Sequence, residues 1–352
     1  MLETMRASSQ PIVFTHYGYS KYLELAVQCC LQTNRGREIW LIGDSENSRL
    51  AEEYEIRHIC RWDLRSRKKE IFNDRFRWIQ GIHHEAVKNG QDWLRWQWER
   101  WFLMEILCKQ EGMNEIWHFD SDVMIVEDLD VAVEYFGGMP GERLRCHPNL
   151  NGLVSYSVLE ELTSYALRLY EDECLLREEG LNMKRRERHA FTEMSCLERY
   201  AANVNSCSCR DLNADVEKYG YFFDQAVMLS DGLRMKGLLI FPKGSLKDIQ
   251  YSQGGFHGWN RSNGKRVRFI TVNCSWVPMC VPVWILQKVR FRDQIKSRHA
   301  ATAERAKTES IVKAFSVLDK EVRKDWVRYC HIPLKMFIAR MLGALKHRKM
   351  HG

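Results

Sequence analysis

Two aspartates, one residue apart at the end of an apolar stretch, are the residues best placed to do chemistry. The stretch EIWHFDSDVMIV, residues 115–126, has the apolar run of a buried strand and carries Asp120 and Asp122 where we expect it to end. Residues two apart in a strand point to the same face, so both carboxylates should lie at one rim of a sheet. Neighbouring carboxylates repel unless a cation neutralises them. We therefore expect Mg²⁺ or Mn²⁺ there, with substrate phosphates completing its oxygen ligands.

The D-x-D pattern alone is weak, because it occurs by chance about once in a chain of this length. Asp128 and Asp130 form the same pattern in a polar stretch that opens a predicted helix. We expect that second pair to cap the helix rather than to bind a metal.

The elements that precede this strand predict a parallel sheet. Residues 12–15 and 38–42 are short apolar runs, and residues 20–32 between them have the apolar spacing of a helix. Such strand–helix–strand units join parallel strands by a right-handed crossover. The polar segments THYGYS and GDSEN follow the two strands, where open parallel sheets bind ligands. A helix is predicted over 91–112, immediately before the aspartate strand.

The composition is that of a globular protein, with 45% hydrophobic and 28% charged residues in a chain of 352. Its twelve cysteines form no disulfide framework and no zinc pattern. No leader-like or membrane-spanning apolar run is present, so we expect a reduced, cytoplasmic protein.

The net charge of +7 is concentrated near the C-terminus. Residues 286–352 hold 17 Lys and Arg against 6 Asp and Glu, whereas residues 1–285 hold 36 against 40. After Pro333, the segment HIPLKMFIARMLGALKHRKMHG has apolar residues at helical spacing among basic ones. We expect a basic amphipathic helix, which either binds an anionic membrane surface peripherally or packs on the core; nucleic acid is not expected.

The chain resembles the nucleotide-sugar-dependent glycosyltransferases of the A-type fold, in which a D-x-D ends a strand and holds a divalent metal against the diphosphate. The resemblance covers roughly residues 11–280 and is specific only in its central block, FDSDVMI. Other segments in the order of the family are PIVFTHYGYSKYL, IWLIGD, ERWFLMEIL, HPNLNGLVSYSVLEEL, FTEMSCLERY and FFDQAVML.

This resemblance implies roles for individual residues. Asp120 and Asp122, with Ser121 between them, would hold the metal and the diphosphate. Arg100, on the helix before this strand, suits phosphate or sugar oxygens because a guanidinium donates two hydrogen bonds in parallel. The residues expected near the base, the ribose or the donor sugar are Thr15, His16, Tyr17, Asp44, His147, Asn149 and Asn151.

One position departs from the family pattern. Many members supply a third metal ligand from a C-terminal histidine, but the corresponding segment VRFITVNCSW has Asn273 at about that place. The nearest histidine is His257 in the glycine-rich segment SQGGFHGWNRSNGK, which is either an exposed hairpin loop or a loop that brings His257 or Lys265 to the phosphates.

Two acids are candidates for the base that an inverting transferase needs. Glu193 follows Thr192, which is expected to cap a helix, and Asp224 in FFDQAVML is expected at another helix start. Because acids at helix starts often only cap, and because a retaining enzyme needs no such base, both roles stay open.

These expectations combine into one hypothesis with two alternatives. We expect an α/β protein of the A-type glycosyltransferase fold, with a mostly parallel central sheet, helices on both faces and a helical tail. Residues 1–285 would form the catalytic domain and 286–352 the basic extension. The donor would be a UDP-sugar and the acceptor a glycan or lipid-linked glycan. The alternatives are a degenerate nucleotide-sugar-binding protein and a haloacid-dehalogenase-type phosphatase, whose usual Thr or Val is replaced by Met124.

Overall fold

The computed structural model divides the chain into two compact units, each with its own sheet. Unit 1 comprises residues 1–23, 36–121 and 133–215, and unit 2 comprises 24–35, 122–132 and 216–352. The residues that the structure describes are 10–83, 91–136, 144–146, 150–203, 209–214, 216–238, 241–275, 277, 279–297 and 309–310.

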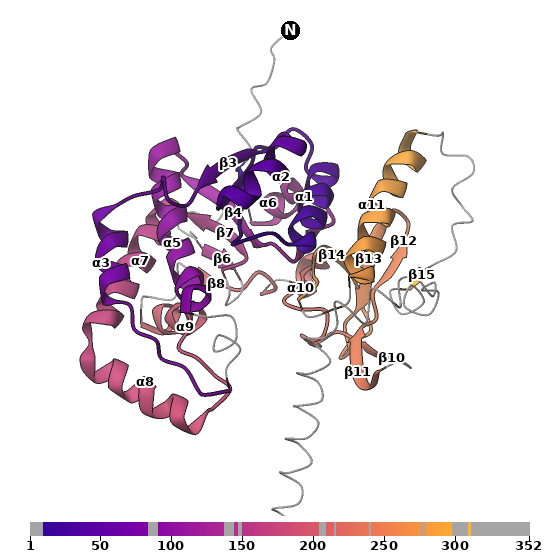
Figure 1. Cartoon of the computed structure of the whole chain (residues 1–352). Helices are drawn as coiled ribbons and strands as arrows, with labels where there is room; N and C mark the ends of the chain where they lie inside the picture. Colours follow the sequence, from indigo (N-terminus) through magenta and orange to yellow (C-terminus); the bar gives the residue numbers. More distant parts are fainter. Residues whose placement is uncertain are drawn as a thin grey trace, which may run out of the picture. The chain divides into compact units, whose positions relative to one another are not determined.

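Unit 1 is built on a seven-stranded sheet with the order β3-β2-β1-β4-β7-β6-β8 (Figure 1). Four of the six neighbouring pairs are parallel, which confirms the predicted α/β class with a mostly parallel sheet. The strands are β1 (Ile12–Thr15), β2 (Ile39–Gly43), β3 (Arg57–Cys60), β4 (Glu115–Asp120), β6 (Leu144–Cys146), β7 (Gly152–Ser155) and β8 (Cys209–Arg210).

Helices flank this sheet, as the strand–helix–strand pattern predicts. In Figure 1, α3, α5 and α7 lie on one side of the sheet and α2 on the other. The two helices predicted over 20–32 and 91–112 are confirmed. The second ends before Gly112, whose φ of 65° favours glycine. The helices of unit 1 are the 3-10 helix η1 (Ser45–Asn47), α2 (Ser48–Glu53), α3 (Arg67–Arg75), α5 (Gln91–Glu111), α7 (Tyr156–Glu171), α8 (Glu173–Arg185) and α9 (Glu193–Asn203). Two further helices, α1 (Lys21–Thr33) and α6 (Leu129–Phe136), have residues in both units.

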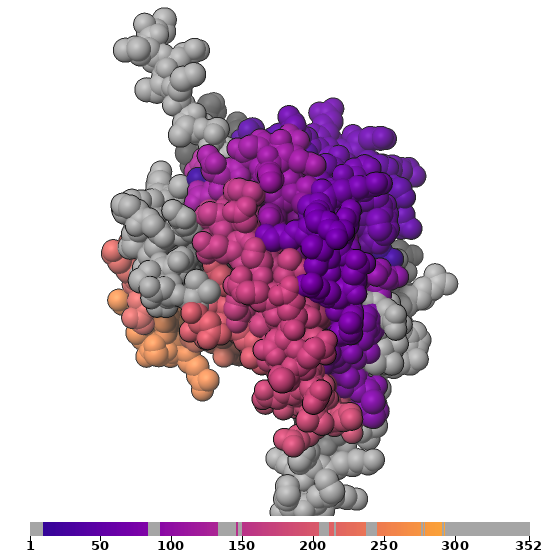
Figure 2. Space-filling view, turned by 90° about the vertical axis from the view of Figure 1, so that its left-hand side faces the viewer, coloured from indigo at the N-terminus to yellow at the C-terminus, as the bar shows by residue number. Residues whose placement is uncertain are grey.

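The core of unit 1 forms where one face of the sheet meets α3, α5, α7 and α9. Val13 and Ile42 of the strands contribute to the same buried cluster as Trp98, Trp101 and Phe102 of α5. The ring of Phe72 on α3 stacks on Phe102 with centroids 4.6 Å apart. Figure 2 shows the outer side of these helices, where the magenta side chains of α7 and α8 lie beside the violet side chains of the N-terminal part of unit 1.

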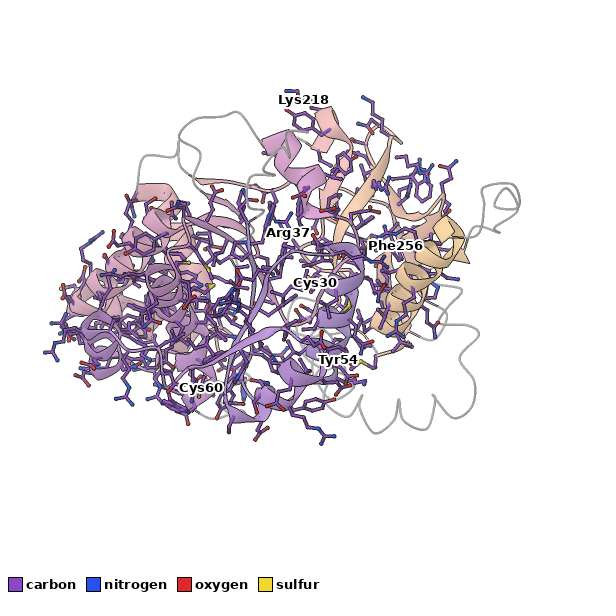
Figure 3. All side chains as sticks on the ribbon, turned by 90° about the horizontal axis from the view of Figure 1, so that it is seen from above. Cys30, Arg37, Tyr54, Cys60, Lys218 and Phe256 are labelled. Atoms are coloured by element: carbon purple, nitrogen blue, oxygen red, sulfur yellow. The ribbon has the colours of Figure 1, made fainter. Side chains whose placement is uncertain are left out.

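Unit 2 contains a second, mostly antiparallel sheet. Its strands follow the path β15-β12-β13-β14-β5, and β9 pairs with β14 in parallel. Phe256 on β13 points toward α11 (Figure 3), where its ring lies 5.6 Å from that of Trp284. The elements are β5 (Val123–Ile125), α10 (Val216–Tyr219), β9 (Tyr221–Phe223), β10 (Met235–Leu238), β11 (Phe241–Lys247), β12 (Gln250–Ser252), β13 (Gly255–Trp259), β14 (Arg266–Asn273), α11 (Cys280–Ser297) and β15 (Glu309–Ser310).

The strand expected to end at the aspartates does end there, but a further strand, which the sequence did not predict, follows at once. β4 ends at Asp120, residues 121–122 form a turn, and β5 then pairs with β14 in the other sheet. The backbone carbonyl of Asp122 accepts a hydrogen bond from the Cys274 N–H at 2.8 Å, so Asp122 follows the geometry of unit 2.

The predicted domain boundary at 285/286 falls within α11. The predicted amphipathic helix after Pro333 lies outside the described residues, so that expectation stays a prediction. None of the described helices is both long enough and apolar enough to cross a lipid bilayer.

Candidate functional site

The sheet of unit 1 reverses its strand order between β1 and β4, and open α/β sheets bind ligands at such a point. Thr15 and Asp120, the last residues of these strands, are direct neighbours in the parallel register. The residues that follow them also meet, because His16 Nδ1 lies 2.9 Å from Ser121 Oγ. The structure thus brings together four residues that the sequence assigned to one site.

Thr15 is held inside the protein. Its hydroxyl lies 3.2 Å from His118 Nε2, and His118 Nδ1 lies 3.0 Å from the carbonyl oxygen of Leu150. Both bonds form if Nδ1 carries the proton, donates to the carbonyl and leaves Nε2 to accept from Thr15. Burial, followed by the charge of Arg100, lowers the pKa of His118 to about 4. His118 is therefore neutral at pH 7 and ties β1 and β4 to the segment before β7.

Asp120 is bound by a buried arginine from α5. Arg100 Nη1 donates to Asp120 Oδ1, and Arg100 Nη2 donates to Glu193 Oε1 at 2.9 Å. Burial lowers the pKa of Arg100, but the charges of Asp120 and Glu193 raise it by more. Burial raises the pKa of Glu193, although Arg100 opposes this. One guanidinium therefore connects two carboxylates that lie 93 and 20 residues away from it in the chain.

The two carboxylates differ in what remains open to a ligand. The side chain of Asp120 is 23% exposed, whereas that of Glu193 is 3% exposed. Glu193 Oε2 is buried and has no hydrogen-bond partner among the described residues. Glu193 opens α9, as predicted, but its carboxylate forms an ion pair with Arg100.

Asn151 holds the other side of Asp120. Its side-chain oxygen accepts the Asp120 N–H at 2.6 Å, and its Nδ2 donates to Asp120 Oδ2 at 3.0 Å. The preceding Leu150 has a φ of 63°, which is unfavourable for a side chain of that size. Its carbonyl is fixed by His118, so this strained turn is what presents Asn151 to Asp120. The neighbouring His147 and Asn149 lie outside the described residues.

The predicted residue Asp44 fastens two loops at the carboxyl ends of β1 and β2. Its side chain accepts the Gly18 N–H at 2.7 Å and the Glu46 N–H at 3.0 Å. Asn47 returns the contact, because its Nδ2 donates to the Gly18 carbonyl at 2.8 Å and its oxygen accepts the Asp44 N–H at 3.0 Å. A Cβ on Gly43 would lie only 2.0 Å from Asn47 Oδ1, so this arrangement requires glycine there.

An aromatic cluster lies beside these loops, and the sequence did not reveal it. The guanidinium carbon of Arg61 is 4.1 Å from the ring centre of Trp62, 4.8 Å from that of Tyr17 and 5.2 Å from that of Trp96. Tyr17 and Trp62 remain 43% and 55% exposed. Arg61 and Trp62 directly follow β3, so their position after a strand was the one available signal.

Asp122 makes its side-chain contact within unit 2. Ser275 Oγ lies 2.7 Å from Asp122 Oδ2 and 2.5 Å from Asn273 Oδ1. The Ser275 N–H also donates to Asn273 Oδ1 at 2.8 Å, which identifies that amide atom as the oxygen. Ser275 has one hydroxyl proton, which it can donate either to Asp122 or to Asn273. Ser275 was not predicted, but Asn273 and Asp122 do lie together.

Asp224 does not open a helix, contrary to prediction. It follows β9, whose pairing with β14 overrides the helical spacing of FFDQAVML. Its side chain is fully buried and accepts from Lys247 Nζ at 2.5 Å and from the Asn273 N–H at 3.0 Å. Lys247 also donates to the Ala226 carbonyl at 2.8 Å and to Asp231 Oδ2 at 2.6 Å. Burial raises the pKa of Asp224, and Lys247 opposes the shift.

His257 lies on β13 and is buried, so neither loop interpretation describes it. Burial, with the charges of Arg266 and Arg268, lowers the pKa of His257 to about 4. It faces Arg268 in the register, five residues before Asn273 on β14, which corresponds to about 16 Å along the strand. His257 and Asn273 therefore cannot ligate the same ion. Lys265 lies in the exposed turn that follows β13.

Asp128 and Asp130 behave as expected of a capping pair. Asp128 Oδ1 accepts the Asp130 N–H at 3.0 Å at the start of α6. Within the described part of the chain, no three His, Cys, Asp or Glu side chains gather closely enough to hold a metal ion.

Comparison with known proteins gives distant structural similarities. No family model matches the chain, and no curated protein sequence matches it. The chain is similar to a solved PaToxG glycosyltransferase, with 13% identity, a TM-score of 0.34, and coverage of 60% of this chain and 76% of that one. It is also similar to a cytidylyltransferase from Leptospira borgpetersenii, with 12% identity, a TM-score of 0.28, and coverage of 56% and 95%.

A third similar structure is the glycosyltransferase GlyE of Streptococcus pneumoniae. The identity is 12%, the TM-score is 0.29, and the match covers 60% of this chain and 47% of that one. At scores this low, the assignment of a function depends on the geometry of the site.

Proposed function

We propose that the protein is a metal-dependent glycosyltransferase, which moves a sugar from a UDP-linked donor to a glycan or lipid-linked acceptor. The observation that carries the proposal is the position of Asp120. It ends β4 at the reversal of strand order, where open α/β sheets bind ligands, and Arg100 and Asn151 orient its carboxylate.

The nucleoside would lie over the carboxyl ends of β1, β2 and β3. The exposed rings of Tyr17 and Trp62 offer flat surfaces on which a base can stack. Asp44 uses two of its acceptor sites within the protein, and a carboxylate has about four, so it can also accept from a ribose hydroxyl.

The divalent cation would be held by Asp120 and Asp122, with Asn273 and Ser275 beside the latter. Carboxylate, amide and hydroxyl oxygen atoms are the ligands that a hard cation such as Mg²⁺ or Mn²⁺ prefers. Only Ser121 separates the two aspartates, so their Cα atoms are at most about 7 Å apart. When bound, the metal would supply positive charge against the departing diphosphate.

Glu193 is the better candidate for the base that accepts a proton from the acceptor. Its Oε2 is uncommitted among the described residues, and burial raises its pKa, which makes it more basic. Both oxygen atoms of Asp224 are hydrogen-bonded to Lys247 or to backbone, so we assign Asp224 a structural role. Arg100 would act as a positioning residue that holds Asp120 and Glu193 in register.

The test is release of nucleoside diphosphate from a panel of nucleotide sugars, with Mn²⁺ or with EDTA, and with and without candidate glycan acceptors. Metal-dependent release from one donor by the wild type, lost in Asp122→Asn, is expected. Asp130→Asn is the matched control, because it changes the other D-x-D pair and should leave turnover intact.

The remaining outcomes separate the alternatives. Metal-dependent donor binding without turnover of any acceptor would identify a degenerate nucleotide-sugar-binding protein. A donor panel that neither binds nor turns over would reject the transferase proposal.

A further inference from the structure

Unit 2 exposes two adjacent apolar side chains on a tightly held turn. Met228 is 43% exposed and Leu229 is 52% exposed, whereas Val227 before them is fully buried. Among the described residues of unit 2, these two are the exposed large hydrophobic side chains, and neither is aromatic. Adjacent exposed apolar side chains are a common mark of an interaction surface.

The turn is rigid, so the exposed side chains are not simply on a loose loop. The Val227 N–H donates to the Asn273 carbonyl at 3.0 Å, and the Val227 carbonyl accepts the Lys247 N–H at 2.9 Å. Lys247 Nζ, which is almost completely buried, binds the Ala226 carbonyl and Asp231 at the two ends of the turn. These bonds hold Met228 and Leu229 outward.

Three exposed cations lie next to this turn. The Arg261 N–H donates to the Gly232 carbonyl at 2.8 Å, and the Arg234 N–H donates to the Trp259 carbonyl at 2.9 Å. A Cβ on Gly264 would lie 3.4 Å from Arg234 Nη2, so that guanidinium rests against the turn that also carries Lys265. The apolar pair and these cations therefore occupy one continuous strip, residues 228–234 and 259–265, which we call the basic apolar strip.

The carboxylates near the basic apolar strip offset only part of its positive charge. Asp231 is bound to the buried Lys247, and Glu217 accepts from Asn263. In the described part of the chain, no carboxylate lies within ion-pair distance of Arg234, Arg261 or Lys265. Lys218 on the neighbouring α10 projects outward (Figure 3) and has its ammonium group 4.6 Å from the ring centre of Tyr219.

We propose that the basic apolar strip docks on an anionic phospholipid bilayer. Met228 and Leu229 would enter the interfacial region, and the three cations would meet the phosphate headgroups. A single-stranded nucleic acid would call for several exposed aromatic rings among the cations, whereas the strip has one aromatic residue, Trp259, which is half-buried. Charge complementarity together with the aliphatic pair therefore favours lipid as the partner. The proposal does not depend on the donor chemistry proposed above.

The test is cosedimentation of the full chain with vesicles of phosphatidylcholine, with and without phosphatidylglycerol. Binding to the anionic vesicles is expected to weaken about fivefold for each of Arg234, Arg261 and Lys265 changed to Ala. Met228→Asp with Leu229→Asp is expected to weaken it at least about tenfold. The matched control is Leu181→Asp on α8, since Leu181 is also 52% exposed and should leave binding unchanged.

Two outcomes would overturn the proposal. If the strip variants bind anionic vesicles as tightly as the wild type, another segment, such as the basic C-terminal extension, is responsible. If the wild type ignores both vesicles and binds a single-stranded oligonucleotide, the partner is a nucleic acid. Far-UV circular dichroism and the midpoint of urea denaturation, measured on the same samples, show that the variants are folded.

Discussion

Two buried clusters in this protein contain the same charges but differ in how completely their polar atoms are hydrogen-bonded. In unit 1, Arg100 lies between Asp120 and Glu193; in unit 2, Lys247 lies between Asp224 and Asp231. Each cluster places one cation between two carboxylates, which compensates part of the free energy lost when charges leave water.

The difference lies in how completely the polar atoms are satisfied. Lys247 Nζ donates to three oxygen atoms, and Asp224 has no exposed surface. Each cluster has one partly exposed carboxylate, Asp231 at 19% and Asp120 at 23%, but only around Arg100 does a buried carboxylate oxygen, Glu193 Oε2, have no partner among the described residues. A closed cluster can only stabilise the fold, whereas an incompletely satisfied one can also receive a ligand.

The largest effect is expected from removing the cation of the Lys247 cluster. Lys247→Met leaves two carboxylates without their buried cation, which should lower the free energy of unfolding by about 3–5 kcal/mol. Urea denaturation followed by circular dichroism measures this loss. Lys236→Met, which removes an exposed lysine from β10, should change it by less than about 0.5 kcal/mol. If the two substitutions change the free energy of unfolding equally, the buried ion pairs of Lys247 do not stabilise the fold.

A second pair of variants compares the two clusters directly. Glu193→Gln should lower donor turnover about 100-fold or more, because the amide cannot accept the proton of the acceptor. Asp224→Asn should lower stability but leave the turnover per folded molecule unchanged. Steady-state kinetics, corrected for the folded fraction, decides this, and a reversed pattern would exchange the roles of the two acids.

The pH dependence of turnover should follow the ionisation of Glu193 in the Arg100 cluster. Burial raises the pKa of Glu193 above its ordinary 4.5, and a base works only when ionised. Turnover should therefore fall about tenfold per pH unit below that raised pKa and become independent of pH above it. In the pH profile of kcat/KM, this fall at acidic pH, the acidic limb, should be absent in Glu193→Gln and present in Asp224→Asn. A limb that survives in Glu193→Gln would assign it to another group.

The smallest effect is expected from an uncharged neighbour of Asp120. Thr15→Val keeps the shape of the side chain but removes the donor to the buried His118, so unfolding should become easier by about 1–2 kcal/mol. Urea denaturation of both variants tests whether losing a buried hydrogen bond lowers the free energy of unfolding as much as losing a buried charge does. If Thr15→Val lowers it as much as Lys247→Met, the charge of Lys247 does not account for the larger loss expected there.

The sequence predicted those parts of the site that depend on local pattern. The apolar run before Asp120, and the helix that ends before Gly112, follow from short-range spacing, and the position of Asp120 at a strand end is confirmed. Thr15 and His16 could be placed with Asp120 and Ser121 because parallel strands align their carboxyl ends.

The contacts that complete the site could not be predicted from spacing. Ser275 meets Asp122 across 153 residues, and Arg100 meets Glu193 across 93. The helix start expected at Asp224 was wrong because pairing of β9 with β14 outweighed a helical spacing of apolar residues. β5 was not predicted as a separate strand, because the apolar residues that follow Asp122 continue the pattern of β4.

The interlock of Asp44, Asn47 and Gly18 has a consequence for the thermodynamics of binding. Loops that become ordered only around a ligand reduce its affinity, because part of the binding free energy is spent on lost chain entropy. Here two hydrogen bonds already join the two loops, and two more fix the loop of Asp44 and Asn47 internally, before any ligand arrives. A nucleotide bound at this edge would meet a preorganised surface, and calorimetry should show a smaller entropic penalty for the wild type than for Asn47→Ala.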